Sequence, residues 1–219
     1  MGFIVSEVYR IAPTIAALWL LSAGPAAAFT SFDLTGSGGY QGSYGFSADG
    51  IGLSVSASTF SGSGSVGSDV LVHQNSTGLG VYSHWGDSSQ VDGSLRNDLL
   101  VFQFDQDVQL LAASFTYGDG NDDFTFFFDG GGDGDLDLTG FADVPTGSTS
   151  MTYVFEQSWI GELFGIGALD TFDNFRVSGL DVEGDISGVS SVPLPLPAFL
   201  LLGGCGLFVA ARHAQKKLT

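Results

Sequence analysis

Cysteine and the basic residues Lys and Arg are scarce in this chain of 219 residues. Its one cysteine, Cys205, can form neither an internal disulfide nor a thiolate metal cluster. Only six Lys and Arg stand against 24 Asp and Glu, which gives a formal net charge of -18 at pH 7. Nucleic-acid binding needs clustered Lys and Arg that neutralise phosphates, so this charge balance excludes a nucleic-acid-binding protein.

Between Phe29 and about Ser191, sequence windows with a helical period are also lacking. The chain instead has 33 Gly and 19 Phe, and short stretches of alternating apolar and polar residues are bounded by Gly, Asp or Asn. This alternation is typical of strands joined by turns. Because 44% of the residues are hydrophobic, the chain has enough apolar surface for a packed core and is not a disordered acidic tail. The length fits one ordinary domain plus processing segments.

Ten strands are predicted from these patterns, and they favour an all-β fold, an antiparallel two-sheet β-sandwich. The ranges are 29–35, 51–60, 69–74, 78–83, 98–105, 108–117, 122–129, 149–157, 163–168 and 171–184. In the fifth strand, Leu100, Phe102 and Phe104 share one face, which we expect to be buried. The dense Phe residues of the seventh strand indicate a central core strand rather than an aromatic platform for a substrate.

The N-terminal residues 1–28 have the pattern of a secretory signal peptide with a signal helix. A basic residue precedes an apolar stretch from Ile11 to Leu21, and Ala26 and Ala28 then form a small-residue A-x-A cleavage site. A buried N-terminal helix is the alternative, but the small-residue end favours the signal peptide. We therefore expect the mature chain to begin at Phe29.

The C-terminus combines spaced prolines, an apolar run and a basic tip. The residues are Val192, Pro193, Leu194, Pro195, Pro197 and Ala198, then an apolar run to Ala211, then Arg212, Lys216 and Lys217. Proline favours an extended backbone, so the first part presents a stiff peptide that a protease can bind. The 14 apolar residues 198–211 are a short transmembrane sorting helix for a hydrocarbon core of roughly 30 Å. The positive-inside rule places the basic tip in the cytoplasm and the rest of the chain outside.

This arrangement resembles the PEP-CTERM sorting tails of exported bacterial proteins, specifically the VPLPA variety. The resemblance rests on the stretch from Val192 to Pro195, the apolar run and the basic tip. It implies processing by exosortase, a membrane-embedded cysteine transpeptidase-like enzyme. It also implies a place at the cell surface or in an extracellular matrix of exopolysaccharide or biofilm. Two features depart from the family pattern: the expected alanine is displaced to Ala198, and Cys205 interrupts the apolar run. The exact cleavage point therefore stays open. The alternative is a plain membrane anchor that is never cut.

These patterns divide the chain into three segments: a signal peptide at 1–28, a β-sandwich domain at 29–187, and a linker with a sorting or anchor segment at 188–219. Residues 78–115 also resemble a segment common in PEP-CTERM proteins, in which a Gly-Leu-Gly-Val strand leads through an acidic loop to an apolar strand. Asp92 and Asp98 occupy its acidic positions. This second resemblance favours a jelly-roll-like sandwich. Over residues 29–197, two basic and 23 acidic residues leave a charge near -21, which would keep the protein soluble and responsive to cations.

Two acidic clusters are the candidate metal ligands. They are Asp119, Asp122 and Asp123 in one turn region, and Asp129, Asp133 and Asp135 in a glycine-rich stretch. Hard oxygen ligands on flexible loops suit calcium, which takes about six to eight oxygens in tolerant geometry. The stretch that begins at Asp129 matches neither an EF-hand loop nor a tandem calcium repeat. Calcium is therefore a hypothesis, and solvated turns formed by Asp-Gly pairs are the alternative.

Groups for catalysis are sparse in the predicted domain. His73 and His84 are its only histidines, it has no cysteine, and no G-x-S-x-G motif is present, so a nucleophilic triad is not supported. Glu156 and Glu162 are the right residue type for a glycosidase pair, but no pattern brings them together. We therefore expect a protein that is not an enzyme.

The expected function is a structural or adhesive role in the extracellular matrix. Its expected partners are an exosortase-like processing enzyme, the inner membrane in transit, and extracellular polysaccharide. The alternative is a calcium-dependent carbohydrate-binding domain, less favourably a glycan-cleaving one, in which Tyr82, Trp85 and Trp159 stack on sugar rings. Ordinary packing at strand ends would explain the same aromatic residues.

Overall fold

The computed structural model describes residues 29–67, 70–118, 122–144 and 151–184. These residues form strands, turns and bends without a helix, which confirms the all-β prediction for this part of the chain. The described residues contain no helix that is long and apolar enough to cross a bilayer. The predicted cleavage site at Ala26 and Ala28, the motif from Val192 to Ala198 and the basic tip from Arg212 lie outside the described residues.

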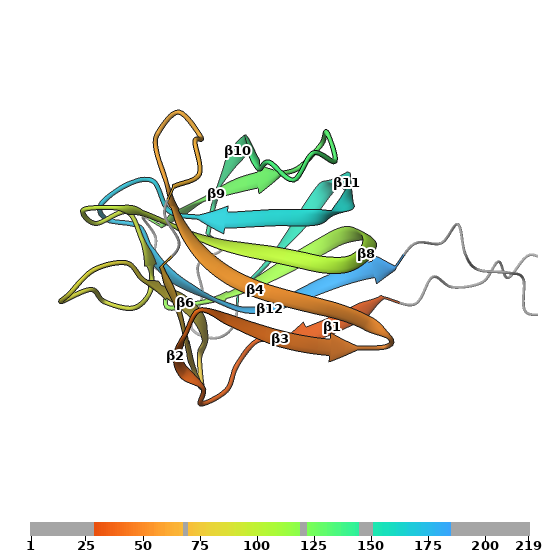
Figure 1. The fold of residues 1–219 in the computed structure, drawn as a ribbon, viewed down its shortest axis with the longest axis horizontal. Coiled ribbons are helices and arrows are strands. Elements are labelled where there is room, and N and C mark those ends of the chain that lie inside the picture. The colour runs from red at the N-terminus through yellow and green to blue at the C-terminus, as the bar shows by residue number, and fades with distance from the viewer. Residues whose placement is uncertain (1–28, 68–69, 119–121, 145–150, 185–219) are drawn as a thin grey trace, which may run out of the picture. The chain divides into compact units, whose positions relative to one another are not determined.

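Twelve strands pair in antiparallel fashion within one connected sheet in the described part of the chain (Figure 1). Their bounds are β1 Thr30–Asp33, β2 Gly39–Gln41, β3 Ser43–Ala48, β4 Ile51–Phe60, β5 Leu71–Asn75, β6 Gly78–Tyr82, β7 Val91–Asp92, β8 Asn97–Thr116, β9 Asp123–Phe128, β10 Asp137–Asp143, β11 Met151–Gly167 and β12 Asn174–Gly184. The main order is β10-β9-β11-β8-β12-β6-β5-β2. Strands β1 and β7 pair with β12, and β4 joins β3 to β8.

Strands β8 and β11 are the longest, and they connect the different parts of the sheet. The first part of β8, Asn97 to Phe104, pairs with β4, and the part from Val108 to Thr116 pairs with β12. Strand β11 pairs with both parts of β8, with shifts in register along the way. The prediction of two separate strands in each of these regions was wrong. The exposed polar residues 105–107 and 156–158 resemble turns in the sequence, yet the strands continue through them.

Apolar side chains from most strands form one large buried cluster and one smaller cluster. Leu100, Phe102 and Phe104 are buried in the large cluster, which confirms the predicted inner face of β8. Phe124 and Phe127 of β9 are also buried, one in each cluster, so the aromatic residues of that strand are core as predicted. Strand β9 also pairs on both sides, with β10 and with β11, so it is an internal strand of the sheet, one strand away from the edge strand β10.

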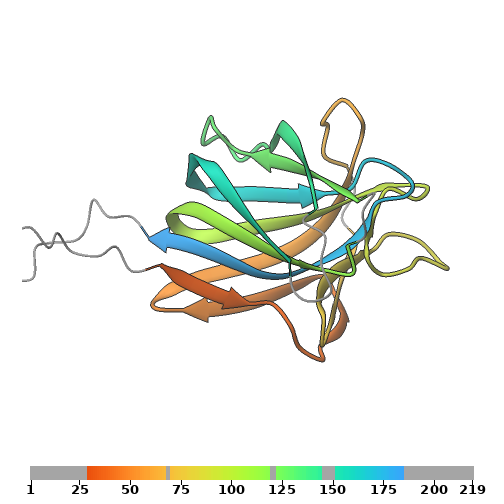
Figure 2. The same cartoon turned by 180° about the vertical axis from the view of Figure 1, so that it is seen from behind.

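The first and last strands lie side by side, as Figure 2 shows. Thr30 of β1 is opposite Val182 of β12, so the domain begins and ends at the same end of the sheet. The other end of β12 pairs with β7 through Asn174 and Asp92. Because β12 has 11 residues, a length of roughly 35 Å separates β7 from the end at which the domain's termini emerge.

Candidate functional site

The segment between β6 and β7 folds back over β6. The backbone N–H of Val81 donates to the carbonyl oxygen of Gln90 at 3.1 Å. Gly80 permits this close approach, since a Cβ there would lie 2.2 Å from the carbonyl oxygen of Ser89. The chain then enters β7 and turns into β8, so residues from a loop and two strands reach the same place.

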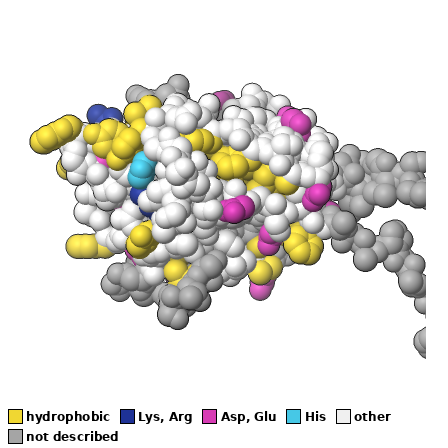
Figure 3. Space-filling model, turned by 90° about the horizontal axis from the view of Figure 1, so that it is seen from below, with side chains coloured by type: hydrophobic (Ala, Val, Ile, Leu, Met, Phe, Trp, Pro, Cys, Tyr) yellow, Lys and Arg dark blue, Asp and Glu magenta, His cyan; other side chains and the backbone are white. Residues whose placement is uncertain are grey.

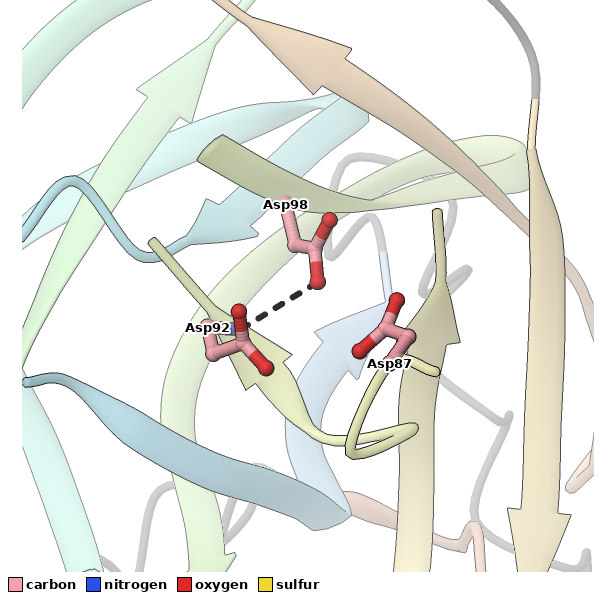
Figure 4. A group of neighbouring side chains, drawn as sticks. All are labelled: Asp87, Asp92 and Asp98. Atoms are coloured by element: carbon pink, nitrogen blue, oxygen red, sulfur yellow. Dashed lines mark hydrogen bonds between the residues drawn. The ribbon is translucent and has the colours of Figure 1, made fainter. Parts of the chain in front are cut away.

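Three carboxylates converge at this place: Asp87 from the loop, Asp92 from β7 and Asp98 from β8. One oxygen from each lies within 4.8 Å of the others, and Figure 4 shows the three side chains directed toward a common space. In the part of the chain that the structure describes, this is the one group of three His, Cys, Asp or Glu residues with ligand atoms so close. We call it the Asp87 cluster.

Asp87 fixes the shape of the loop. Its Oδ2 accepts a hydrogen bond from the Ser83 backbone N–H at 2.6 Å, and its Oδ1 accepts one from the Ser89 backbone N–H at 3.1 Å. The carboxylate therefore holds both ends of the loop. The side chain is fully buried, and its nearest basic group is the His84 ring, with Nδ1 3.8 Å from Oδ2.

Asp92 and Asp98 are joined directly. The backbone N–H of Asp92 donates to Oδ2 of Asp98 at 3.3 Å (Figure 4). The two carboxylate oxygens of Asp92 accept hydrogen bonds from the Ser88 hydroxyl at 2.6 Å and the Ser94 backbone N–H at 2.8 Å. These bonds aim both side chains into the cluster.

Asp98 is the most constrained member, with 0% of its surface exposed. Its Oδ1 is buried and accepts no hydrogen bond. Burial, followed by repulsion from Asp92 and Asp87, raises the pKa of Asp98 from its ordinary 3.8 to about 8. A hydrogen bond from the nearby Ser83 hydroxyl would lower the pKa of Asp98. A hydroxyl has one proton to donate, however, and Ser83 donates it to Oδ2 of Asp87 at 3.1 Å.

Neither arginine of the described residues neutralises the cluster. Arg96 donates to the carbonyl oxygen of Ser83 at 3.2 Å. Arg176 is buried on β12 and donates to the carbonyl oxygens of His73 at 3.4 Å and Gly78 at 3.5 Å. No lysine occurs between residues 29 and 184, and no Arg–carboxylate ion pair is formed in the described part of the chain.

The first predicted calcium cluster is only partly described, because Asp119 lies outside the described residues. Asp122 is buried, and its Oδ1 accepts a hydrogen bond from the Asn174 backbone N–H at 2.8 Å. The adjacent Asp123 is exposed. Partial loss of water around its carboxyl group, followed by a hydrogen bond with Asp143, raises the pKa of Asp123. These two side chains have different partners, and calcium here stays a prediction.

The second predicted calcium cluster forms a loop closed by its own backbone. Asp129 accepts four backbone N–H groups, which lower its pKa; they belong to Gly131, Gly132, Asp133 and Gly134. Asp133 accepts the backbone N–H of Asp135 at 3.2 Å. Asp129, Asp133 and Asp135 are not brought together as a group of close ligand atoms, so the loop has the turn structure that was the alternative, and calcium there stays a prediction.

The residues considered for catalysis are separated. His73 is half-buried in β5 and stacks on Tyr40 with ring centroids 4.3 Å apart, whereas His84 lies in the loop before Asp87. Glu162 lines a depression of about 470 Å³, and Glu156 lines a different one of about 260 Å³. The structure therefore gives no support to a carboxylate pair formed by these two residues.

The depression beside Glu156 is rich in aromatic side chains and lies between β10 and β11. Its lining is Phe124, Phe126, Phe141, Tyr153, Phe155 and Trp159, with Thr139, Gly140, Ala142, Glu156 and Gln157. We call it the aromatic groove. Trp159, one of the predicted sugar-stacking residues, packs 5.5 Å from Phe126 between ring centroids.

The other two predicted sugar-stacking residues lie elsewhere. Tyr82 contacts Tyr40 edge to face at 5.0 Å, and Trp85 is 93% exposed in the loop that Asp87 closes. Figure 3 shows hydrophobic side chains standing out at one end of the molecule, near a histidine and basic side chains. The three predicted residues therefore do not form one surface.

Comparisons of the chain with family models, curated proteins and solved structures found no match. The functional hypotheses therefore depend on the sequence motifs and on the geometry above. Sequence patterns indicated Asp92 and Asp98 only as acidic positions of a strand-loop-strand segment and did not indicate Asp87. The sequence does contain a signal, which is three aspartates beside two short turns. Their spacing does not match a calcium-binding loop, because two strands, β7 and β8, bring them together rather than one continuous loop.

The raised pKa of Asp98 predicts a pH dependence in calcium-free buffer with EDTA. Between about pH 4 and pH 8 the folded chain keeps a proton on Asp98 that the unfolded chain has lost. The free energy of unfolding should therefore fall as pH rises from 5 to 8. Urea denaturation of wild type, Asp98→Asn and the exposed control Asp133→Asn measures it. Asp98→Asn should flatten the pH profile, and equal slopes for wild type and Asp98→Asn would contradict the assignment.

Proposed function

We propose that the chain is an exported bacterial surface or matrix protein with a structural or adhesive role in extracellular polysaccharide. The single observation that carries the proposal is the C-terminal sequence, in which the Val192 to Pro195 motif, an apolar run and a basic tip follow one another. The apolar N-terminus with its small-residue cleavage site supports export by the general secretory route. An exosortase-like enzyme would then process the tail.

The described domain is compatible with this role. We propose that its antiparallel strands fold over the large core as a jelly-roll-like sandwich. Because Thr30 and Val182 are neighbours, both processing segments would attach to one end of the domain. The loop with Trp85 and the Asp87 cluster would then lie toward the far end, where an extracellular partner has access.

The mass of the mature protein tests export and sorting together. Protein isolated from the organism that produces it should begin at Phe29 and lack the residues after the Val192 to Ala198 segment. A Pro193→Ala, Pro195→Ala double variant should keep the C-terminal segment, because the stiff recognition peptide is lost. Top-down mass spectrometry of the membrane and extracellular fractions measures both ends. A wild-type chain that retains both termini would contradict the proposal.

Glycan binding is the second candidate function, and the aromatic groove favours it. Sugar rings stack on aromatic faces, and ligand sites are typically concave and aromatic with a few polar groups. The groove offers the half-buried rings of Tyr153 and Trp159, with Glu156 and Gln157 available to accept or donate hydrogen bonds. This arrangement supports binding of a polysaccharide chain along β11.

A matched pair of tryptophan variants tests glycan binding. Trp159→Ala should weaken retention on the matrix polysaccharide of the producing organism roughly fivefold, because one stacking contact is worth on the order of 1 kcal/mol. Trp85→Ala is the control, since Trp85 is 93% exposed but does not line the groove. Affinity electrophoresis in polysaccharide gels measures retention. Equal retention of both variants and wild type would contradict a role for the groove.

A further inference from the structure

We propose that Asp87, Asp92 and Asp98 bind one divalent cation, and that the ion is calcium. The site differs from both acidic loops that the sequence indicated. Its ligands come from the loop after β6, from β7 and from the start of β8 (Figure 4). The proposal does not depend on the proposed function.

The spacing of the carboxylates fits a shared calcium ion. Two oxygens bound to one calcium at about 2.4 Å lie at most about 5 Å apart. The three ligand oxygens of the Asp87 cluster lie within 4.8 Å of one another. A magnesium ion demands nearly octahedral geometry and usually keeps several of its water ligands. Calcium tolerates the irregular set of ligands that two strands and a loop supply.

The charge of the cluster calls for a cation. The carboxylates of Asp87 and Asp98 are fully buried, and Asp92 is 5% exposed. Buried charges are costly unless they are paired or coordinate a metal. Both arginines of the described residues bond to carbonyl oxygens, as shown above, and His84 is the one basic side chain within 4 Å of a carboxylate of the cluster. A divalent ion would neutralise most of the negative charge that these residues carry at neutral pH.

Asp98 provides an independent observation that points to a ligand. Its side chain is completely buried and directed into the cluster, and yet its Oδ1 has no hydrogen-bond donor. Buried carboxylate oxygens without a donor are rare, and an ion or water at the site is a usual explanation. The neighbouring N–H groups and hydroxyls satisfy the other two aspartates, so within the Asp87 cluster Oδ1 of Asp98 is the oxygen without a donor.

The surroundings can complete a calcium shell. Calcium takes about six to eight oxygens, which include hydroxyls, carbonyl groups and water. The hydroxyls of Ser83 and Ser88 already lie within hydrogen-bonding distance of Asp87 and Asp92. With the three carboxylates they supply mainly hard oxygen ligands, which calcium prefers, and the one nitrogen nearby is Nδ1 of His84, 3.8 Å from Oδ2 of Asp87.

Titration of the EDTA-stripped, full-length chain with CaCl₂ tests the proposal. The chain is held in detergent micelles, and isothermal titration calorimetry should report one calcium per chain. Calcium should raise the thermal midpoint, because a ligand that binds only the folded state stabilises it. Magnesium chloride under the same conditions should bind more weakly than calcium.

Three variants locate the ion. Asp98→Asn should weaken calcium binding by about tenfold or more, since even outer-shell changes cost about tenfold to 100-fold. In EDTA the same variant should melt at a higher temperature than wild type, because an amide needs no proton to stay neutral when it is buried. Asp87→Asn is the second ligand variant and serves if the first does not fold. Asp133→Asn in the Asp129 loop is the matched control and should bind calcium as wild type does.

The outcomes separate the alternatives. Loss of calcium binding in both ligand variants, with normal binding in Asp133→Asn, would support the site. Absence of calcium binding by wild type would overturn it and would leave a shared proton as the means of tolerating the buried carboxylates. Binding that persists in both ligand variants, or that disappears in Asp133→Asn alone, would also overturn it. Tighter binding of magnesium than of calcium would overturn the choice of ion.

Discussion

The burial of three carboxylates at one point, without an arginine or lysine beside them, is the constraint on which the account of this protein depends. The backbone creates it: Asp92 and Asp98 follow one another through a short turn, and Asp87 is held by the N–H groups of its own loop. Packing of this segment against β6 and β12 removes water from the carboxylates. A cation or a bound proton must then offset the repulsion.

The strand arrangement explains why this place is isolated from the ends of the domain. Strands β8, β11 and β12 are long and extend from one end of the sheet toward the other. The pairing of β1 with β12 brings the termini of the domain together at one end. The Asp87 cluster lies where β12 meets β7, at the opposite end of that strand. A protein tethered through its terminal segments would thus keep the cluster distant from its attachment.

Sequence patterns predicted most of the strands, because apolar and polar residues alternate along a strand wherever one of its faces is buried. They predicted β4 with its observed bounds and the inner face of β8. They missed β2, β3, β7 and β10, which are short or largely exposed and carry little apolar signal. The site was harder: the acidic loops 119–123 and 129–135 are conspicuous in sequence, whereas convergence of Asp87, Asp92 and Asp98 depends on strand pairing that no local pattern encodes.

Anomalous diffraction from crystals grown in calcium chloride tests the central claim most directly. The account predicts a single strong peak between the carboxylates of Asp87, Asp92 and Asp98, with Oδ1 or Oδ2 of Asp98 at a calcium–oxygen distance of about 2.4 Å. A map with calcium only at the Asp129 loop, or with no ion near Asp98, would contradict it.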